Sequence, residues 1–488
     1  MRLFYSVNTT KTHMHFEFLQ EDGWLALAWL AVCRADQVSI SIRHGHDVET
    51  RDAWFCEAVW DAEFEQGDFD RTDIVFGSGG RLRNDELIFV SSGSTCDRLH
   101  HIQIKSINYV SNSLVCLAAA LDLEFDPWYP GYYEDIATIG HGIDDYKTSI
   151  TSNAGELNLT YFRNLRWDGT ELSALEKPQT DRKLQCFDDY QSLLTGALKK
   201  LKSNMAAPTR RLNFSPISTC SSGYDSLAVS VLAREIDTQL AICVPQDRIQ
   251  QNDSGVELVQ QLDMQALVIE RNAWRETDFA EALFIAADAC GRDVWLQPAA
   301  EQLYGQVLLT GYFGDAAWSE KNTSKQGRFY RSEKTGPAGV SLGEFRLKAG
   351  FIHCPVPFIA AQALQSSTLL SANQEMAAWR YNHQYDRPVP RRIIESAGID
   401  RAQFGTRKTA VAVHLFREKE FHRFFAGTTS FRDYMRWIRQ RSLENPPPAS
   451  ESYNITSPEL EKIEVPLARQ LFPWAVDYCK RYYRKTKD

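Results

Sequence analysis

Between residues 212 and 269 the chain alternates short apolar runs with helix-like stretches, and this alternation is the strongest constraint on its fold. Strands are predicted at 212–219, 240–244 and 266–269, and helices at 227–236 and 255–262. Neighbouring parallel strands need a connection of a dozen or more residues, which a helix supplies. The sequence therefore predicts an α/β fold with a doubly wound parallel sheet in this part of the chain.

Residues 1–182 have a different pattern, in which short apolar stretches are cut by turn residues. Strands are expected at 86–91, 102–104, 107–110 and 157–161, with a helix at 113–121. The ten apolar residues 24–33 predict a buried helix, since a membrane span needs about 20. A helix over 187–202 then leads into the second part. We expect an α+β domain at 1–182 and an α/β domain at 183–488.

Composition narrows the classes of protein and of site. The net charge of −9 argues against wrapping nucleic acid, which requires a basic surface. The ten cysteines are scattered without a Cys-x-x-Cys pair, so we expect them to pack as small core residues rather than bind zinc or form a disulfide framework. The N-terminal residues do not have the pattern of a signal peptide. We therefore expect a soluble, cytoplasmic protein without a nucleic-acid or membrane partner.

The stretch with the clearest chemistry follows the first strand of the α/β part and consists of Ser221, Ser222, Gly223, Tyr224, Asp225 and Ser226. A turn of small residues at the start of a helix exposes backbone N–H groups, and the helix dipole favours an anion there. Ser221 and Ser226 add hydroxyl donors. Asp225 would repel a bare phosphate, so its natural role is to hold the Mg²⁺ that accompanies one. The alternative is an ordinary capped turn between a strand and a helix.

These residues resemble the Ser-Gly-Gly-x-Asp-Ser pyrophosphate loop of the ATP pyrophosphatase superfamily, with Ser222 in place of one Gly. The resemblance implies a loop that holds the pyrophosphate released when ATP adenylates a carboxylate. A second segment, Thr310-Gly311-Tyr312-Phe313-Gly314-Asp315, is similar to the Ser/Thr-Gly-x-Gly-x-Asp segment of asparagine synthetase-like enzymes. This similarity implies that Gly311 contributes to the ATP site and that Asp315 is a second Mg²⁺ ligand beside Asp225.

Three further residues extend the resemblance to β-lactam and carbapenam synthetases. Tyr312 lies three residues before Asp315, as the catalytic tyrosine of those enzymes does. Glu344 is the best match for the glutamate that pairs with this tyrosine to deprotonate the attacking amine. Lys408 matches the lysine that stabilises the acyl-adenylate and the tetrahedral intermediate. The ordinary alternatives are a packed aromatic ring, a solvated carboxylate, and a surface cation beside a phosphate-binding Arg407.

The first part of the chain also resembles this family. Residues 110–114 are similar to the end of the glutamine amidotransferase domain, an Ntn-type fold whose nucleophile is an N-terminal cysteine. Arg2 stands where that cysteine is required, which predicts a degenerate domain without glutaminase activity, as in the β-lactam-forming enzymes and lasso-peptide cyclases. The segment 385–388, Tyr-Asp-Arg-Pro, is similar to lasso-peptide cyclases as well, whose substrate supplies its own amine.

The resemblance thus implies a carbon–nitrogen ligase that uses ATP and Mg²⁺ and forms AMP and pyrophosphate. It would adenylate a carboxylate of a small-molecule or peptide substrate and join it to an amine, with an intramolecular lactam or macrolactam as the first choice. Two alternatives stay open. One is an asparagine synthetase-like enzyme that uses ammonia or an external amine. The other is a catalytically inactive binding protein on this fold, favoured by Ser222 and by Ala316, where asparagine synthetase has Glu. A partner protein or a homo-oligomer also stays open.

Overall fold

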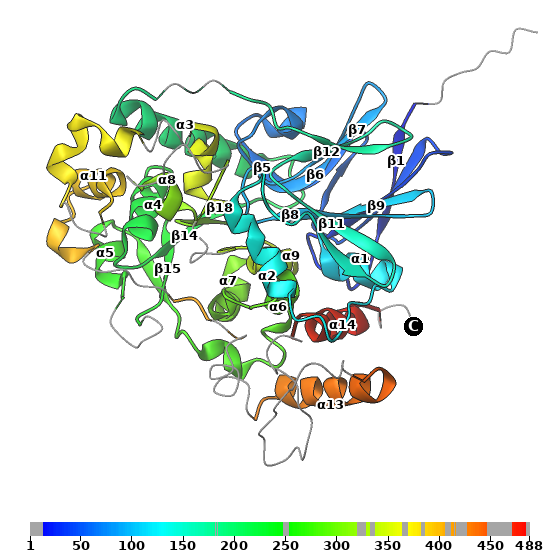
Figure 1. Ribbon diagram of the computed structural model, residues 1–488. Coiled ribbons are helices and arrows are strands. Elements are labelled where there is room, and N and C mark those ends of the chain that lie inside the picture. The colour runs from blue at the N-terminus through cyan, green and yellow to red at the C-terminus, as the bar shows by residue number, and fades with distance from the viewer. Residues whose placement is uncertain are drawn as a thin grey trace, which may run out of the picture.

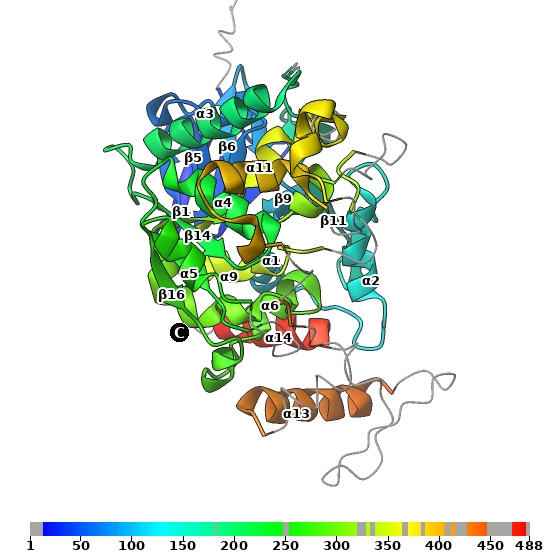
Figure 2. The ribbon, with the colours of Figure 1, turned by 90° about the vertical axis from the view of Figure 1, so that its left-hand side faces the viewer.

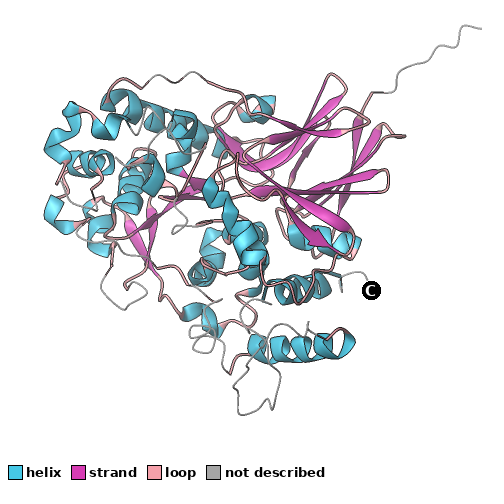
Figure 3. Cartoon of the chain, viewed as in Figure 1, coloured by secondary structure: helices cyan, strands magenta, loops and turns pink. Residues whose placement is uncertain are grey.

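The computed structural model describes residues 13–180, 182, 184–246, 253–319, 328–331, 337–363, 369–381, 386–405, 411–413, 415, 427–446 and 471–484. Within these residues the chain is a mixed α/β protein with three sheets, of which the smallest has five strands, all parallel. Figure 1 shows the two larger sheets side by side with the parallel sheet and its helices, and Figure 3 distinguishes the strands from the helices around them. No helix in the described ranges is both long enough and apolar enough to cross a membrane.

The two larger sheets come from the first part of the chain and pack face to face. The seven-stranded sheet has the order β1-β3-β2-β9-β8-β11-β10, with β1 His15–Gln20, β2 Trp29–Arg34, β3 Ser39–His44, β8 Arg98–Ile104, β9 Ile107–Ser111, β10 Ser149–Ser152 and β11 Gly155–Tyr161. The six-stranded sheet has the order β13-β12-β7-β6-β5-β4, with β4 Glu49–Arg51, β5 Trp54–Trp60, β6 Val75–Arg83, β7 Glu86–Val90, β12 Asn164–Trp167 and β13 Leu172–Leu175. Their inner faces meet in an apolar core, where the ring of Trp29 lies 5.1 Å from that of Phe55 and 6.0 Å from that of Phe89.

The apolar run 24–33 is buried as predicted, but the expected helix is wrong. Its second half is β2, which lies between β3 and β9 in the middle of the seven-stranded sheet. Trp29, Ala31 and Cys33 face the other sheet, whereas Leu30 belongs to the core that contains α1 (Leu114–Leu121). A strand that is buried on both faces is apolar throughout, so it lacks the alternation by which a strand is recognised.

The five parallel strands have the order β16-β15-β14-β17-β18, with β14 Ser215–Cys220, β15 Leu240–Cys243, β16 Gln265–Val268, β17 Gln306–Thr310 and β18 Ile352–Pro355. The accompanying helices include α3 Phe187–Met205, α4 Tyr224–Arg234, α5 Val256–Gln261, α6 Ala282–Asp288, α9 Leu342–Ala349 and α11 Pro388–Ser396. The predicted alternation of strands and helices is confirmed. After β14 the chain adds β15 and β16 on one side and then crosses over to add β17 and β18 on the other. The direction of strand addition therefore reverses between β14 and β17.

The two parts of the chain are joined by packing and by a buried ion network. Helix α14 (Leu471–Arg484) packs against α1 of the first part and α6 of the second, and α13 (Thr429–Glu444) lies beyond it at the edge of the molecule (Figure 2). The guanidinium of Arg346 on α9 lies 2.6 Å from the carboxylate of Glu57 and 2.7 Å from that of Asp97. All three side chains are buried. Removing one partner of such a network leaves an unpaired buried charge, which is strongly destabilising.

The cysteines support this account of the core. All ten have free thiols, and nine of them are buried. Their expected role as small core residues is confirmed.

Candidate active site

The loop site, defined here as residues 221–226 and 311–315, lies where the order of the parallel strands reverses. β14 ends at Cys220 and β17 ends at Thr310, and the two strands are hydrogen-bonded neighbours. Because they are parallel, the loops that follow them leave the same edge of the sheet. In open α/β sheets, ligands bind outside the carboxyl ends of the strands at this kind of reversal. The two segments singled out in the sequence are therefore brought together.

The first loop is braced by its own serines. The hydroxyl oxygens of Ser221 and Ser226 lie 2.8 Å apart, and the Ser226 hydroxyl accepts the backbone N–H of Ser221 at 3.1 Å. The backbone N–H of Gly223 donates to the Ser221 hydroxyl at 3.2 Å. Gly223 has extended backbone angles, and α4 starts at the next residue. These bonds hold the first turn of α4 at the carboxyl end of β14, where its dipole favours an anion.

Ser222, which stands where the family loop has Gly, is held against a neighbouring loop. Its hydroxyl donates to Oδ1 of Asp253 at 2.7 Å, and its backbone N–H donates to the Asp253 carbonyl at 3.3 Å. Its own carbonyl accepts the N–H of Gly405 at 2.8 Å. The side chain that replaces glycine thus has a polar partner in the fold.

Tyr224 contributes to packing between helices. Its ring is buried, and its hydroxyl accepts a hydrogen bond from the guanidinium of Arg391 on α11. Burial raises the pKa of Tyr224 to about 12. A Cβ on Gly405 would lie 2.3 Å from this ring, which explains the glycine there. The sequence pattern predicts Tyr224 among the phosphate-binding residues, whereas the contacts of its side chain give it a role in packing.

Asp225 is pressed against the second loop. A Cβ on Gly314 would lie 2.9 Å from the carboxylate of Asp225, and one on Gly311 would lie 2.5 Å from its backbone carbonyl carbon. The two loops therefore approach so closely because glycine stands at both positions. Oδ1 of Asp225 is buried and accepts no hydrogen bond from the residues that the structure describes, and Nη1 of Arg387 lies 3.7 Å away from it. A buried carboxylate oxygen without a hydrogen bond fits a ligand of a hard cation such as Mg²⁺.

Asp315 lies directly after Gly314 and faces an arginine. Its Oδ1 lies 3.3 Å from Nη2 of Arg331. No cluster of three or more His, Cys, Asp or Glu side chains suited to a metal occurs in the described part of the chain. Mg²⁺ in phosphate-binding sites is commonly held by one or two carboxylates together with phosphate oxygens. Asp225 and Asp315, on adjacent loops, fit that donor set.

Tyr312 is hydrogen-bonded to Asp293, a residue that no sequence pattern predicts as part of the site. Its hydroxyl donates to Oδ1 of Asp293 at 2.5 Å, and the Ser341 hydroxyl donates to Oδ2 of the same carboxylate at 2.5 Å. Burial and the carboxylate of Asp293 raise the pKa of Tyr312 well above its usual value. The ring of Tyr312 meets the buried His353 edge to face, with centroids 5.5 Å apart. No sequence motif marks Asp293, because its place beside Tyr312 depends on how the chain folds after α6.

Glu344 has different partners from those expected. Its carboxylate accepts the hydroxyl of Ser113 and the backbone N–H of Leu114, each at 2.6 Å. It therefore stabilises the N-terminus of α1, where unpaired N–H groups and the helix dipole attract a negative charge. Desolvation by burial raises the pKa of Glu344. In the described part of the chain Tyr312 and Glu344 thus have different hydrogen-bond partners, and their joint action on the amine stays a prediction. Lys408 lies outside the described residues.

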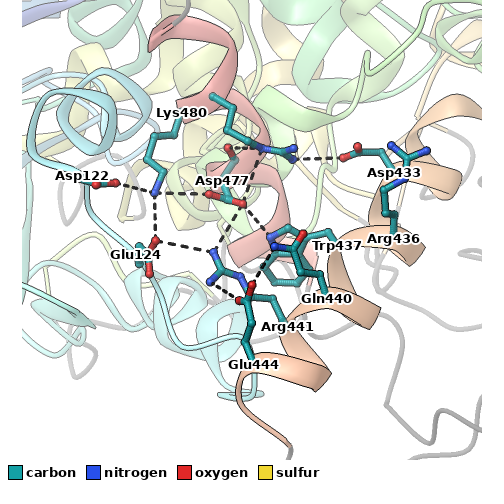
Figure 4. A pocket seen from close by; sticks show the side chains of 11 residues that line it. Asp122, Glu124, Asp433, Arg436, Trp437, Gln440, Arg441, Glu444, Asp477 and Lys480 are labelled. Atoms are coloured by element: carbon teal, nitrogen blue, oxygen red, sulfur yellow. Dashed lines mark hydrogen bonds and ion pairs between the residues drawn. The ribbon is translucent and has the colours of Figure 1, made fainter.

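A charged groove lies away from these loops, between α13, α14 and the segment after α1, with a cavity of about 340 Å³ (Figure 4). Nζ of Lys480 lies 3.1 Å from Asp122, 3.7 Å from Glu124 and 3.5 Å from Asp477. Arg441 adds ion pairs with Glu124 and Asp477 at 3.8 Å each. The opposite charges that line this groove pair with one another, so they join α14 to its neighbours.

The sequence matches no family model, and no curated protein matches it either.

Proposed function

We propose that the chain is an ATP-dependent amide synthetase that adenylates a substrate carboxylate and joins it to an amine, releasing AMP and pyrophosphate. The observation that carries this proposal is the contact between the carboxylate of Asp225 and the backbone of Gly314. This contact links two loops, each with a candidate metal carboxylate, at the reversal point of a parallel sheet. The fold assignment that goes with it is an Ntn-type amidotransferase-like part without its nucleophile, followed by an ATP pyrophosphatase-like part. Cytoplasmic location belongs to the same proposal, since ATP is found there.

The first half-reaction would take place at the loop site. Asp225 and Asp315 would hold Mg²⁺, which neutralises phosphate charge when bound. The first turn of α4, which starts at Tyr224, would bind the phosphates that become pyrophosphate. A carboxylate oxygen of the substrate attacks the α-phosphorus of ATP, and the bond to the bridging oxygen of the β-phosphate breaks. The electron pair leaves with pyrophosphate.

The second half-reaction would use Tyr312 and Asp293. An amine attacks the carbonyl carbon of the acyl-adenylate, and AMP leaves. The amine nitrogen must lose a proton, which the hydroxyl oxygen of Tyr312 would accept as its own proton passes to Oδ1 of Asp293, 2.5 Å away. A general base of this kind contributes about 10²–10⁴-fold. An amine within the same substrate, which gives a lactam or macrolactam, remains the preferred reaction.

The experiment that tests the proposal has two stages. Calorimetric titration of the purified chain with Mg·ATP comes first, and we expect saturable binding that Asp225→Asn weakens strongly while circular dichroism stays unchanged. A panel of carboxylates with hydroxylamine as a surrogate amine comes second, with pyrophosphate and hydroxamate as the products measured. Absence of Mg·ATP binding by the wild-type chain would refute the proposed function.

A further inference from the structure

Arg387 is the last residue before α11, and its guanidinium lies against both loops of the loop site. Nη1 donates to the carbonyl oxygen of Gly314 at 2.6 Å, and the same atom lies 3.7 Å from Oδ1 of Asp225. The side chain is 11% exposed, and that of Asp225 is 18% exposed. A cation is thus fixed next to the carboxylate that is the better candidate for a metal ligand.

The positive charge beside the two loops comes from the side chain of Arg387 and not from backbone N–H groups at the start of α11. Pro388 and Pro390 occupy the first and third positions of that helix and have no backbone N–H. The first turn of α11 therefore offers few donors to an anion. A guanidinium carries five N–H donors in a planar fork, and this geometry matches pairs of phosphate oxygens.

The other arginines near this helix have structural partners. Arg391 is buried, donates to the hydroxyl of Tyr224 and lies 3.7 Å from the centroid of the Tyr381 ring. Arg392 faces away, 3.6 Å from Asp188 and 3.7 Å from Glu375. Arg387, in contrast, contacts both loops on which ATP would be held.

We propose that Arg387 binds the polyphosphate of ATP, and pyrophosphate after the reaction, next to Asp225. This inference rests on the proposed function. The charge balance supports it: Asp225 and Asp315 bring two negative charges to the site, and Arg387 and Arg331 bring two positive ones. With Mg²⁺ added, the site carries a net positive charge that suits a polyanion. Arg387 compensates for the carboxylate of Asp225, which would otherwise repel the phosphates.

The test compares three ligands that differ in their phosphate groups. The wild-type chain, Arg387→Gln, Arg387→Lys and the surface control Arg401→Gln are titrated with Mg·ATP, Mg·pyrophosphate and AMP. Arg401 is 42% exposed and pairs with Glu395, so the control removes one positive charge away from the loops. We expect Arg387→Gln to weaken Mg·ATP and Mg·pyrophosphate binding by about 10- to 100-fold. AMP binding should change less than about twofold, and Arg387→Lys should recover part of the loss because it keeps the charge.

Each outcome has one meaning. If the wild-type chain binds Mg·ATP and Arg387→Gln binds it equally well, the assignment of Arg387 is wrong while the proposed function stands. If Arg387→Gln weakens AMP as much as Mg·ATP, Arg387 acts as a brace between the loops, which also overturns the assignment. If the wild-type chain binds none of the three, the proposed function itself fails. If Arg387→Gln does not fold, the same three ligands are titrated into Arg387→Lys. This variant should still bind Mg·ATP and Mg·pyrophosphate more weakly than the wild-type chain, with AMP binding nearly unchanged.

Discussion

Replacing Gly314 by alanine tests whether contact between the two loops positions Asp225. The backbone of Gly314 has a negative φ, so alanine is compatible with its conformation. The new Cβ would lie 2.8 Å from Cε3 of Trp318 and 2.9 Å from the carboxylate of Asp225. Carbon atoms pack at about 3.5 Å or more, so the contact with Trp318 is too short by about 0.7 Å and that with Asp225 by about 0.6 Å. The Trp318 ring is fully buried and donates to the hydroxyl of Tyr190 at 2.7 Å. The carboxylate of Asp225 should therefore move.

We expect Gly314→Ala to lower the free energy of unfolding by about 1–3 kcal/mol, the usual cost of overpacking. Mg·ATP affinity should fall by at least about tenfold, because Asp225 leaves its position. Urea denaturation and calorimetric titration measure the two effects. The matched control is Gly196→Ala in α3, where a Cβ would meet nothing within 4 Å. It should stabilise the chain by about 0.5–1 kcal/mol and leave binding unchanged. Wild-type stability and affinity in Gly314→Ala would refute this reasoning.

Three further predictions concern single carboxylates. Asp293→Asn should lower hydroxamate formation by about 10²–10⁴-fold with Mg·ATP affinity unchanged; full activity in this variant would remove Asp293 from the proton pathway. Glu344→Gln should cost about 1 kcal/mol of stability in urea denaturation, because the start of α1 loses a charge, and should leave Mg·ATP binding unchanged. Normal stability with lost activity would return Glu344 to the catalytic residues. Burial raises the pKa of Glu281 from 4.5 to about 7, so the folded chain binds more protons than the unfolded chain between these values. The free energy of unfolding should therefore fall as pH rises from about 4.5 to about 7, and Glu281→Gln should flatten that part of its pH profile. An identical slope in both proteins would show that the raised pKa of Glu281 is not its cause.

The strands, helices and loop that the sequence predicts correctly are those that depend on a local residue pattern. Strands β14, β15 and β16 and helices α3 and α4 follow from apolar periodicity, and the loop at 221–226 from its small residues. The strand β2 was missed because its burial on both faces gave it the composition of a core helix. Periodicity describes a single element, whereas the exposure of each face depends on neighbours far away in the sequence.

Partners across the fold were the least predictable. The distance of Glu344 along the chain from Tyr312 predicts that the two act together, yet Glu344 lies against Ser113, which comes from the first part of the chain. Asp293 and Arg387 reach the site from segments without a motif of their own. Such contacts result from the packing of helices, and a spacing rule taken from other proteins transfers only when that packing is the same.

The position of α14 has a consequence for synthesis of the chain. Its partner α1 is complete at Leu121, whereas α14 begins at Leu471, about 350 residues later. At roughly 5–20 residues per second, the ribosome needs about 20–70 s to supply the missing helix. During that interval the side of α1 that α14 covers has no native cover, even after the last strand of the two larger sheets, β13, has been synthesised. A nascent chain of this kind is exposed to aggregation for most of its translation, and chaperones that bind apolar helices would act on it in that window.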